Sequence, residues 1–336
     1  MNILLTGGAG YIGSHTALEL CGMGHTVVLF DNLSNSNVVV VQKLEQIMGG
    51  SVPFVQGDVR ETTHLMEVLA KFKIEAVFHF AGLKAVGESS EQPMSYYANN
   101  VQGTISLLQA MQKQQIKTLV FSSSATVYGQ PQYLPLDEAH PTGATNPYAR
   151  TKLHIEEMLQ DLAASDPDWR IAILRYFNPV GAHPSGLIGE DPTGIPNNLM
   201  PYVAHVAAGK LPHLNVWGSD YPTSDGTGVR DYIHVMDLAE GHAAALGHSQ
   251  SNGGCHIFNL GTGKGTSVLE LVAAFEQACQ KKLQIILGSR RTGDTAICYA
   301  NTDKAFRVLS WQASRTLADM CLSSWAFQRM NVQRPE

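Results

Sequence analysis

A tyrosine and a lysine four residues apart, Tyr148 and Lys152, are the residues of this chain best suited to proton transfer. On a helix they share one face, about one turn apart. A free tyrosine hydroxyl has a pKa of about 10, and a nearby ammonium group favours the phenolate. The pair could therefore act as an acid/base. The alternative for this common spacing is a solvated helix face.

Hydroxyl residues lie just upstream, at the end of an apolar run. Residues 119–129 read LVFSSSATVYG, a strand that opens into three serines. Open α/β sheets bind ligands at the carboxyl ends of their strands, so a serine here could hydrogen-bond a substrate hydroxyl and pass its proton to Tyr148. We expect Ser124 in that role and Thr126 as the next candidate. Ordinary turn chemistry is the alternative for each serine taken separately.

A glycine-rich turn lies near the N-terminus. Residues 2–5 predict a buried strand, and Gly7, Gly10 and Gly13 follow before a helical pattern over 11–23. Such glycines let the backbone approach a pyrophosphate at the helix N-terminus. The next strand, 26–30, ends at Asp31, whose carboxylate could accept hydrogen bonds from a ribose and would repel a 2′-phosphate. No arginine lies beside Asp31, so the pattern favours NAD over NADP; a plain loop aspartate is the alternative.

Composition and charge agree with an enzyme of the cytoplasm. The 336 residues are 44% hydrophobic, ample for a large core, and the length suggests two domains. The net charge of −6 argues against nucleic acid as a partner. We find no apolar run long enough for a membrane span, no signal peptide and no metal spacing. The five cysteines show no pairing pattern and are expected as reduced thiols.

Strands and helices alternate through the first half of the chain. This predicts an α/β fold, a Rossmann-type doubly wound parallel sheet covered on both faces. From Asn178 onward glycine and proline increase and the alternation breaks down, which indicates a smaller α/β substrate domain. The expected strands are 2–6, 26–30, 53–56, 75–80, 117–122 and 170–175, and the expected helices are 11–23, 38–48, 62–71, 93–114 and 146–163. Residues 232–262 predict a helix followed by a strand at 256–260.

These motifs resemble the extended short-chain dehydrogenases/reductases, and longer stretches closely resemble the UDP-glucose 4-epimerase family within them. The stretches are 79–89 (HFAGLKAVGES), 122–129, 175–184 (RYFNPVGAHP), 194–202 (GIPNNLMPY) and 225–235 (DGTGVRDYIHV). The similarity covers essentially the whole chain. It implies an NAD-binding domain over 1–177 plus about 232–262, and an interrupted UDP-sugar-binding domain over 178–231 and about 263–336.

The resemblance also implies the cofactor contacts. Lys152 would lower the pKa of Tyr148 and bind the nicotinamide ribose, and Asp58 would meet the adenine. The full set is Gly7, Gly10, Tyr11, Ile12, Gly13, Asp31, Asn32, Asn35, Ser36, Asp58, Val59, Phe80, Ala81, Gly82, Lys84, Asn99, Ser122, Ser124, Tyr148, Lys152 and Tyr176.

For the substrate, arginine forks suit a pyrophosphate, and the resemblance gives this role to Arg230 and Arg291. Asp294 would contact a ribose, and 215–217 would lie against the uracil. For a single arginine the alternative is a solvated charge. The full set is Lys84, Ser124, Ala125, Thr126, Tyr148, Phe177, Asn178, Asn198, Leu199, Asn215, Val216, Trp217, Arg230, Tyr232, Arg291, Asp294 and Cys298.

The implied reaction is epimerisation at C4 of a UDP-hexose through a 4-keto sugar, with Tyr148 as base and Ser124 bridging. A nucleotide-sugar 4,6-dehydratase is the alternative enzyme, but it needs a further acid/base pair after the strand end, where this chain has Ala125 and Thr126. A cofactor-binding regulator without turnover is the alternative of another class. Such proteins typically lose the tyrosine or the lysine, and both are present here.

Two finer expectations concern assembly and substrate breadth. Helices 93–114 and 146–163 carry apolar residues on more than one side, namely Leu107, Leu108, Leu153, Met158 and Leu159. A C2 homodimer would bury such faces, unless the chain's own core absorbs them. Cys298 stands where the family carries either tyrosine or a small residue in the sugar pocket. We therefore expect activity on N-acetylated UDP-hexoses, unless Cys298 is a structural thiol.

Overall fold

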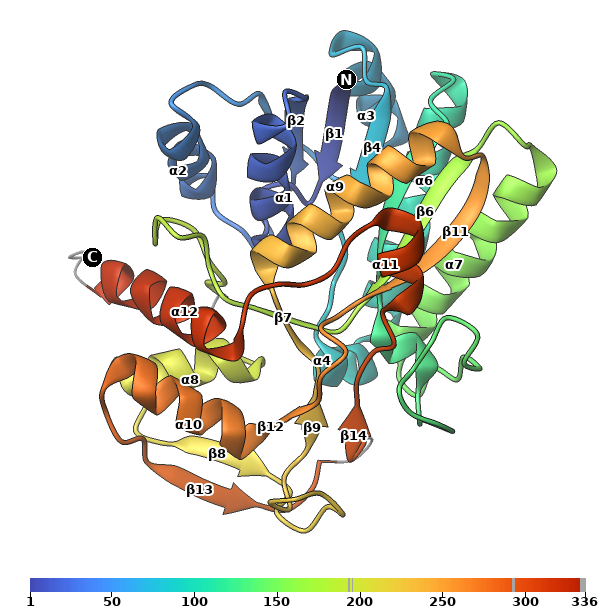
Figure 1. Cartoon of the computed structure of the whole chain (residues 1–336). Coiled ribbons are helices and arrows are strands. Elements are labelled where there is room, and N and C mark those ends of the chain that lie inside the picture. Colours follow the sequence, from blue (N-terminus) through green and yellow to red (C-terminus); the bar gives the residue numbers. More distant parts are fainter. Residues whose placement is uncertain (193, 195, 292–293, 333–336) are drawn as a thin grey trace.

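Seven parallel strands form the central sheet in a computed structural model of the chain (Figure 1). The structure describes residues 1–192, 194, 196–291 and 294–332. The strand order is β11-β6-β5-β4-β1-β2-β3, and each adjacent pair is parallel. The strands are β1 (Asn2–Thr6), β2 (Thr26–Asp31), β3 (Phe54–Gln56), β4 (Ala76–His79), β5 (Thr118–Ser124), β6 (Arg170–Tyr176) and β11 (Gly254–Leu260).

Helices cover both faces of this sheet. Leu4 and Leu5 of β1 point to opposite faces, and both are fully buried, each in a different apolar cluster. This is how a parallel sheet buries its near-continuous apolar strands, so the predicted doubly wound α/β fold is confirmed. One face carries α1 (Tyr11–Gly22), α2 (Val39–Met48) and α9 (Val235–Ser251), and the other carries α3 (Thr62–Lys71), α6 (Gly103–Lys113) and α7 (Pro147–Ser165).

Two of the predicted helices differ from the observed ones. The helix expected over 93–114 is broken into α5 (Pro93–Tyr96), a π-helical turn η1 (Tyr97–Gln102) and α6, after a short α4 (Val86–Glu91). A π-helical turn changes which side chains of the helix face the core. In this turn the side chain of Asn100 is buried. The helix expected from 232 begins at Val235, because Tyr232–His234 forms strand β10.

The second half adds a smaller layer at one end of the sheet (Figure 1). Helices α8, α10 and α12 pack with strand β8 in a third cluster around Val203, Val216 and Phe275. No helix in the described ranges is long and apolar enough to cross a membrane. The elements are β7 (Asn178–Val180), α8 (Leu199–Ala207), β8 (Leu214–Trp217), β9 (Val229–Arg230), β10, β12 (Thr266–Ser267), α10 (Val268–Cys279), β13 (Ile285–Gly288), β14 (Ile297–Cys298), α11 (Asp303–Leu309) and α12 (Leu317–Val332).

Candidate active site

All seven parallel strands end at one edge of the sheet, and candidate site residues lie at or just after most of these ends. β1 ends before the glycine turn, β2 ends at Asp31, β4 ends before Phe80, β5 ends at Ser124 and β6 ends at Tyr176. Because the strands are parallel, these ends lie on the same side, outside the carboxyl edge where open α/β sheets bind ligands. The structure thus gathers segments that are up to 170 residues apart, as the bond from the Tyr11 hydroxyl to the Gly181 carbonyl (2.7 Å) also shows.

The glycine turn leaves no room for side chains. A Cβ on Gly7, which has φ +70°, would lie 2.7 Å from the backbone nitrogen of Ala81, and a Cβ on Gly13 would lie 2.4 Å from the Gly7 carbonyl oxygen. Gly10 is the N-cap of α1 and makes no side-chain cap hydrogen bond. The first N–H groups of α1 are therefore left for a ligand. This cradle fits the pyrophosphate of NAD.

A Gly13→Ala substitution should loosen cofactor binding. The added methyl would overlap the Gly7 carbonyl and lie 2.9 Å from Gly8 Cα, so the backbone of the turn must shift. We expect at least about tenfold weaker NAD binding, because the shift displaces the donors of the cradle. Fluorescence titration of cofactor-stripped protein measures it. Gly22→Ala is the matched control, since its Cβ would meet nothing within 4 Å; equal losses in both variants would contradict the account.

Asp31 connects the end of β2 to the glycine turn. Its Oδ2 accepts a hydrogen bond from the Ala9 N–H (3.1 Å), and its Oδ1 accepts from the Leu33 N–H and the Ser36 hydroxyl, both at 2.9 Å. The carboxylate is buried at the edge of the cradle. The Asp31 carboxylate therefore lies where a dinucleotide would place its ribose, and it also holds the Ser36 hydroxyl by a hydrogen bond.

Asp58 lies beside this loop and already has a cationic partner. Arg60 pairs with it at 2.7 Å, and Asn32 donates to it at 3.3 Å. The hydrogen bond from Arg60 lowers the pKa of Asp58 to about 2. Asp58 is thus ionised at neutral pH. A cofactor in contact with its carboxylate would share that carboxylate with Arg60.

Ser124 and Tyr148 meet at the ends of their elements. Ser124 ends β5 and caps the short helix η2 (Ala125–Tyr128), where its hydroxyl accepts from the Thr126 N–H and hydroxyl at 3.2 and 2.9 Å. Helix α7 begins at Pro147 behind Asn146, whose Oδ1 accepts from the Ala149 N–H at 2.9 Å. This places Tyr148 in the first turn, within hydrogen-bonding reach of the Ser124 hydroxyl. The structure therefore brings the predicted base and its bridge together.

Lys152 lies one turn further along α7 and is almost fully buried. Its ammonium donates to the Ser122 carbonyl at 2.6 Å and lies 4.9 Å from the centre of the Phe121 ring. A Cβ on Gly82 would lie 3.6 Å from this ammonium. The bare backbone of Gly82 thus leaves space beside the cation, which fits the nicotinamide ribose of NAD.

Burial shifts the pKa values of both members of this pair. Burial raises the pKa of Tyr148, and its hydrogen bond with Ser124 opposes that rise only in part. Burial lowers the pKa of Lys152 to about 8, against the attraction of Glu156. The net pKa of Tyr148 is therefore raised, because desolvation is the largest cause of its shift, and the lowering by Lys152 stays a prediction. At pH 7 Tyr148 is the neutral phenol and Lys152 is mainly protonated.

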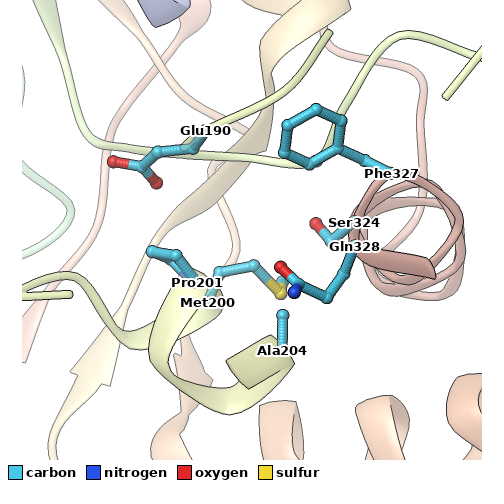
Figure 2. Close-up of a pocket in the computed structure, with 8 residues that line it drawn as sticks. Glu190, Met200, Pro201, Ala204, Ser324, Phe327 and Gln328 are labelled. Atoms are coloured by element: carbon cyan, nitrogen blue, oxygen red, sulfur yellow. The ribbon is translucent and has the colours of Figure 1, made fainter. Parts of the chain in front are cut away.

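Glu190 joins two predicted substrate residues. One of its oxygens accepts from the Lys84 ammonium at 2.9 Å and from the Asn198 amide at 2.6 Å. Its other oxygen is buried and has no hydrogen-bond partner in the described part of the chain. Figure 2 shows Glu190 across a small pocket from Ser324 and Gln328 of α12. The loop after β4 and the start of α8 are thereby tied to one carboxylate.

Cys298 packs against an apolar cluster that includes Ala125, the residue after Ser124. The cluster also holds Phe177, Tyr128 and Leu136. Its strand β14 pairs with β9, with Cys298 opposite Arg230. Burial raises the pKa of the thiol to about 11, so Cys298 is neutral at pH 7. Any effect of Cys298 on a bound sugar would therefore come from the size of its side chain.

The other predicted substrate residues lie in the smaller layer. Arg291 and Asp294 form an ion pair at 3.0 Å beside residues 292–293, which lie outside the described ranges. Asn215, Val216 and Trp217 lie on β8, where Trp217 is 45% exposed. Tyr232 is buried in the third cluster. Within the described residues, no hydrogen bond joins these side chains to Ser124, Tyr148 or Lys152.

Sequence reasoning missed several buried polar residues that connect these segments. Asn100 bonds the N–H and carbonyl of Leu83 and the Thr151 hydroxyl, so it fixes the loop after β4 against α7. Asp231 accepts from Thr262, Gly263 and Ala300, and it lies between two predicted residues in a motif that the sequence had singled out. Glu156 continues the row of Tyr148 and Lys152 at four-residue spacing, a signal that was visible in the sequence.

A dinucleotide cradle and a serine–tyrosine–lysine set at one sheet edge define a short-chain dehydrogenase/reductase. The model of the NAD dependent epimerase/dehydratase family matches residues 3–261. The UDP-glucose 4-epimerases of Bacillus subtilis and Homo sapiens are 55% and 54% identical to this chain; the alignments cover 99% and 98% of this chain and 98% and 97% of the relatives.

Solved structures agree with these relatives. The UDP-glucose-4-epimerase of Stenotrophomonas maltophila, crystallised with NAD and formylated UDP-arabinopyranose, is 51% identical with a TM-score of 0.97 over 98% of both chains. That of Bifidobacterium longum, in complex with NAD+ and UDP, is 51% identical with a TM-score of 0.96 over 98% of this chain and 99% of its own. This chain belongs to the NAD-dependent epimerase/dehydratase family, in its UDP-glucose 4-epimerase branch.

Proposed function

We propose that Ser124, Tyr148 and Lys152 carry out the reaction of this chain. The chain is an isomerase that epimerises UDP-hexoses at C4, interconverting UDP-glucose and UDP-galactose, with NAD as its cofactor. The observation that supports the residue assignment best is the Ser124 hydroxyl within reach of Tyr148, with the Lys152 ammonium buried one turn away. The nucleotide-sugar dehydratase is disfavoured, because apolar Ala125 occupies the place of its extra carboxylate.

In this proposal Tyr148 acts as the phenolate, the form that Lys152 and the positive ring of bound NAD would favour; it takes the proton of the sugar 4-hydroxyl and later returns one to the 4-keto oxygen. Ser124 bridges the two oxygens, since its hydroxyl can accept from one and donate to the other. Lys152 stabilises the phenolate form by its charge at a site shielded from water. Bound NAD supplies the hydride acceptor at C4 and a positive ring charge. The 4-keto sugar must turn within the pocket so that hydrogen returns on its other face.

The proposal divides the chain into two domains. Residues 1–177 plus about 232–262 hold the cofactor, and residues 178–231 and about 263–336 hold the UDP-sugar. Pairing of β11 with β6 supports the first part, and the separate apolar cluster of α8, α10 and α12 supports the second. The five free cysteines support a cytoplasmic location as part of the same proposal.

Product analysis tests the function. Purified protein given UDP-galactose and no added reductant should form UDP-glucose to equilibrium, and perchloric acid should release NAD(H) from it. Because the cofactor is regenerated in every turnover, it should stay bound through gel filtration. A 4-keto-6-deoxy product would support the dehydratase instead, and stable cofactor binding without turnover would support the regulator.

We further propose that the chain accepts N-acetylated UDP-hexoses. The small Cys298 side chain beside Ala125 and Phe177 leaves room for an N-acetyl group as the keto sugar turns. Another residue could close the pocket, in which case Cys298 is only a structural thiol.

A homodimer is also part of the proposal, but three of the five side chains expected at its interface are not available to a partner. Leu107, Leu108 and Leu159 are buried in the chain's own core, so they offer no face to a partner. Support comes instead from α4 and α5, which pack on α7 and expose Val86 (44%) and Met94 (75%). A second copy would bury these side chains.

Light scattering at micromolar concentration should give the dimer mass for the wild type. Met94→Glu should shift the mass toward the monomer, because a carboxylate cannot be buried unpaired. Met23→Glu, exposed just after α1, is the control and should stay dimeric. A wild-type monomer would reject the dimer.

A further inference from the structure

One buried ion pair lies directly behind the proposed reaction centre. Glu156 follows Tyr148 and Lys152 at four-residue spacing, so the three side chains lie on one face of α7. Glu156 lies deep between α7 and the sheet, where its exposure is 0%. A carboxylate is held at such a depth only when partners satisfy it fully.

Glu156 has such partners on both neighbouring strands. Arg175 of β6 donates from Nε to both carboxylate oxygens at 3.1 Å and from Nη2 to Oε2 at 2.6 Å. The hydroxyl of Ser123 on β5 donates to Oε1. On its other side, the Arg175 guanidinium lies 4.8 Å from the centre of the Tyr128 ring. The pair therefore fastens α7 to β5, β6 and η2 at once.

This attachment sets the place of the two residues that precede Glu156. Three consecutive serines of β5 all contact α7: the Ser122 carbonyl accepts from Lys152, Ser123 bonds Glu156, and Ser124 reaches Tyr148. Ser123 is the middle one of the three. A rotation or slide of α7 that breaks its bond to Glu156 also moves Lys152 and Tyr148 off their serines.

Glu156 also affects the charge of Lys152. The titratable groups that interact with Lys152, or with its neighbour Tyr148, include Glu156 of α7, His79 of β4 and Tyr176 of β6. Burial lowers the pKa of His79 to about 3 and raises that of Tyr176, so both are neutral at pH 7. Glu156 thus supplies the negative charge that opposes the desolvation of Lys152 in the described part of the chain.

We propose that Glu156 is the positioning residue of the reaction centre. Its hydrogen bonds with Arg175 and Ser123 hold Lys152 and Tyr148 in place at the end of β5. The inference rests on the proposed roles of Tyr148 and Lys152. It adds a residue that touches neither substrate nor cofactor and acts through the other two.

Two variants test the role of Glu156, so that the test survives if one of them does not fold. Glu156→Gln keeps the shape and removes the charge, but leaves Arg175 unpaired and can fail to fold. The double variant E156M/R175M removes both charges with side chains of similar size, a change that buried pairs tolerate well. Asp237→Asn is the matched control, because Asp237 is also fully buried and paired with an arginine, Arg315, at 2.5 Å.

We expect the double variant to keep its circular dichroism spectrum and its KM for UDP-glucose within about threefold, while kcat falls about 100-fold. The alkaline limb of the kcat profile, where Lys152 loses its proton, should move about half a pH unit or more toward lower pH, because the lowered pKa of Lys152 falls further without Glu156. Asp237→Asn should reduce the melting temperature and leave that limb in place.

A folded double variant with wild-type kcat and an unmoved alkaline limb would overturn the inference. An equal shift in Asp237→Asn would do so as well, since it would reduce the effect to general destabilisation. The wild type in the same assay separates this test from the proposed function: if the wild type fails to interconvert UDP-glucose and UDP-galactose, the function itself is refuted.

Discussion

Tyr148→Phe should reduce kcat by about 100- to 10,000-fold, the range that a positioned acid/base contributes. The substitution removes the hydroxyl that faces Ser124 one turn from Lys152, and it keeps the aromatic ring. Binding of UDP should change little, because the nucleotide contacts proposed for the smaller layer are untouched. Initial rates with UDP-galactose and calorimetric titration with UDP measure the two effects separately.

Tyr133→Phe is the control for this change. Tyr133 is 44% exposed, and its hydroxyl donates to Asp137 at 2.8 Å, outside the candidate site. It should keep full activity. A Tyr148→Phe enzyme within about threefold of the wild-type rate would show that the proton is moved by another group, since loss of a true acid/base costs far more.

Cys298→Tyr should separate the two kinds of substrate. We expect kcat/KM for UDP-N-acetylglucosamine to fall about 100-fold, and that for UDP-glucose to stay within about threefold, because the added ring occupies the space of an N-acetyl group. Cys298 packs against the apolar cluster that holds Ala125 and Phe177, so the added ring would take up space beside that cluster. The thiol is neutral at pH 7, since burial raises its pKa to about 11, and the effect is therefore one of volume.

Cys298→Ser controls for loss of the thiol itself and should keep both activities. Melting temperatures of both variants check that the ring has not simply disrupted β14. Two results would remove Cys298 from this role: no activity of the wild type on the N-acetylated substrate, or full retention of that activity in Cys298→Tyr.

Much of the fold and of the site could be predicted because the signals are local. Apolar strands such as 2–6 and 170–175 and the glycine turn carry their conformation in their own residues, and parallel strands bring their carboxyl ends together. Ser124 and Tyr148 could be paired in advance for that reason, since each stands at the sheet-edge end of its element.

Tertiary packing decided what the sequence could not show. The break of the 93–114 helix into a π-helical turn depends on the bonds of Asn100 to Leu83 and Thr151, which no periodicity contains. The partial burial of Tyr148, and hence the direction of its pKa shift, depends on the elements that pack around it. Leu107 and Leu159 looked free for a partner only because the helices that pack on them were unknown.

The fate of deuterium at C4 tests the central claim, which is oxidation and reduction at C4 by NAD within one enzyme. UDP-galactose labelled with deuterium at C4 should give UDP-glucose that carries the label at C4, because hydrogen is removed and returned without exchange with water. Mass spectrometry and proton NMR of the product measure this. Loss of the label to solvent, or its transfer to C6 in a 6-deoxy product, would contradict the account.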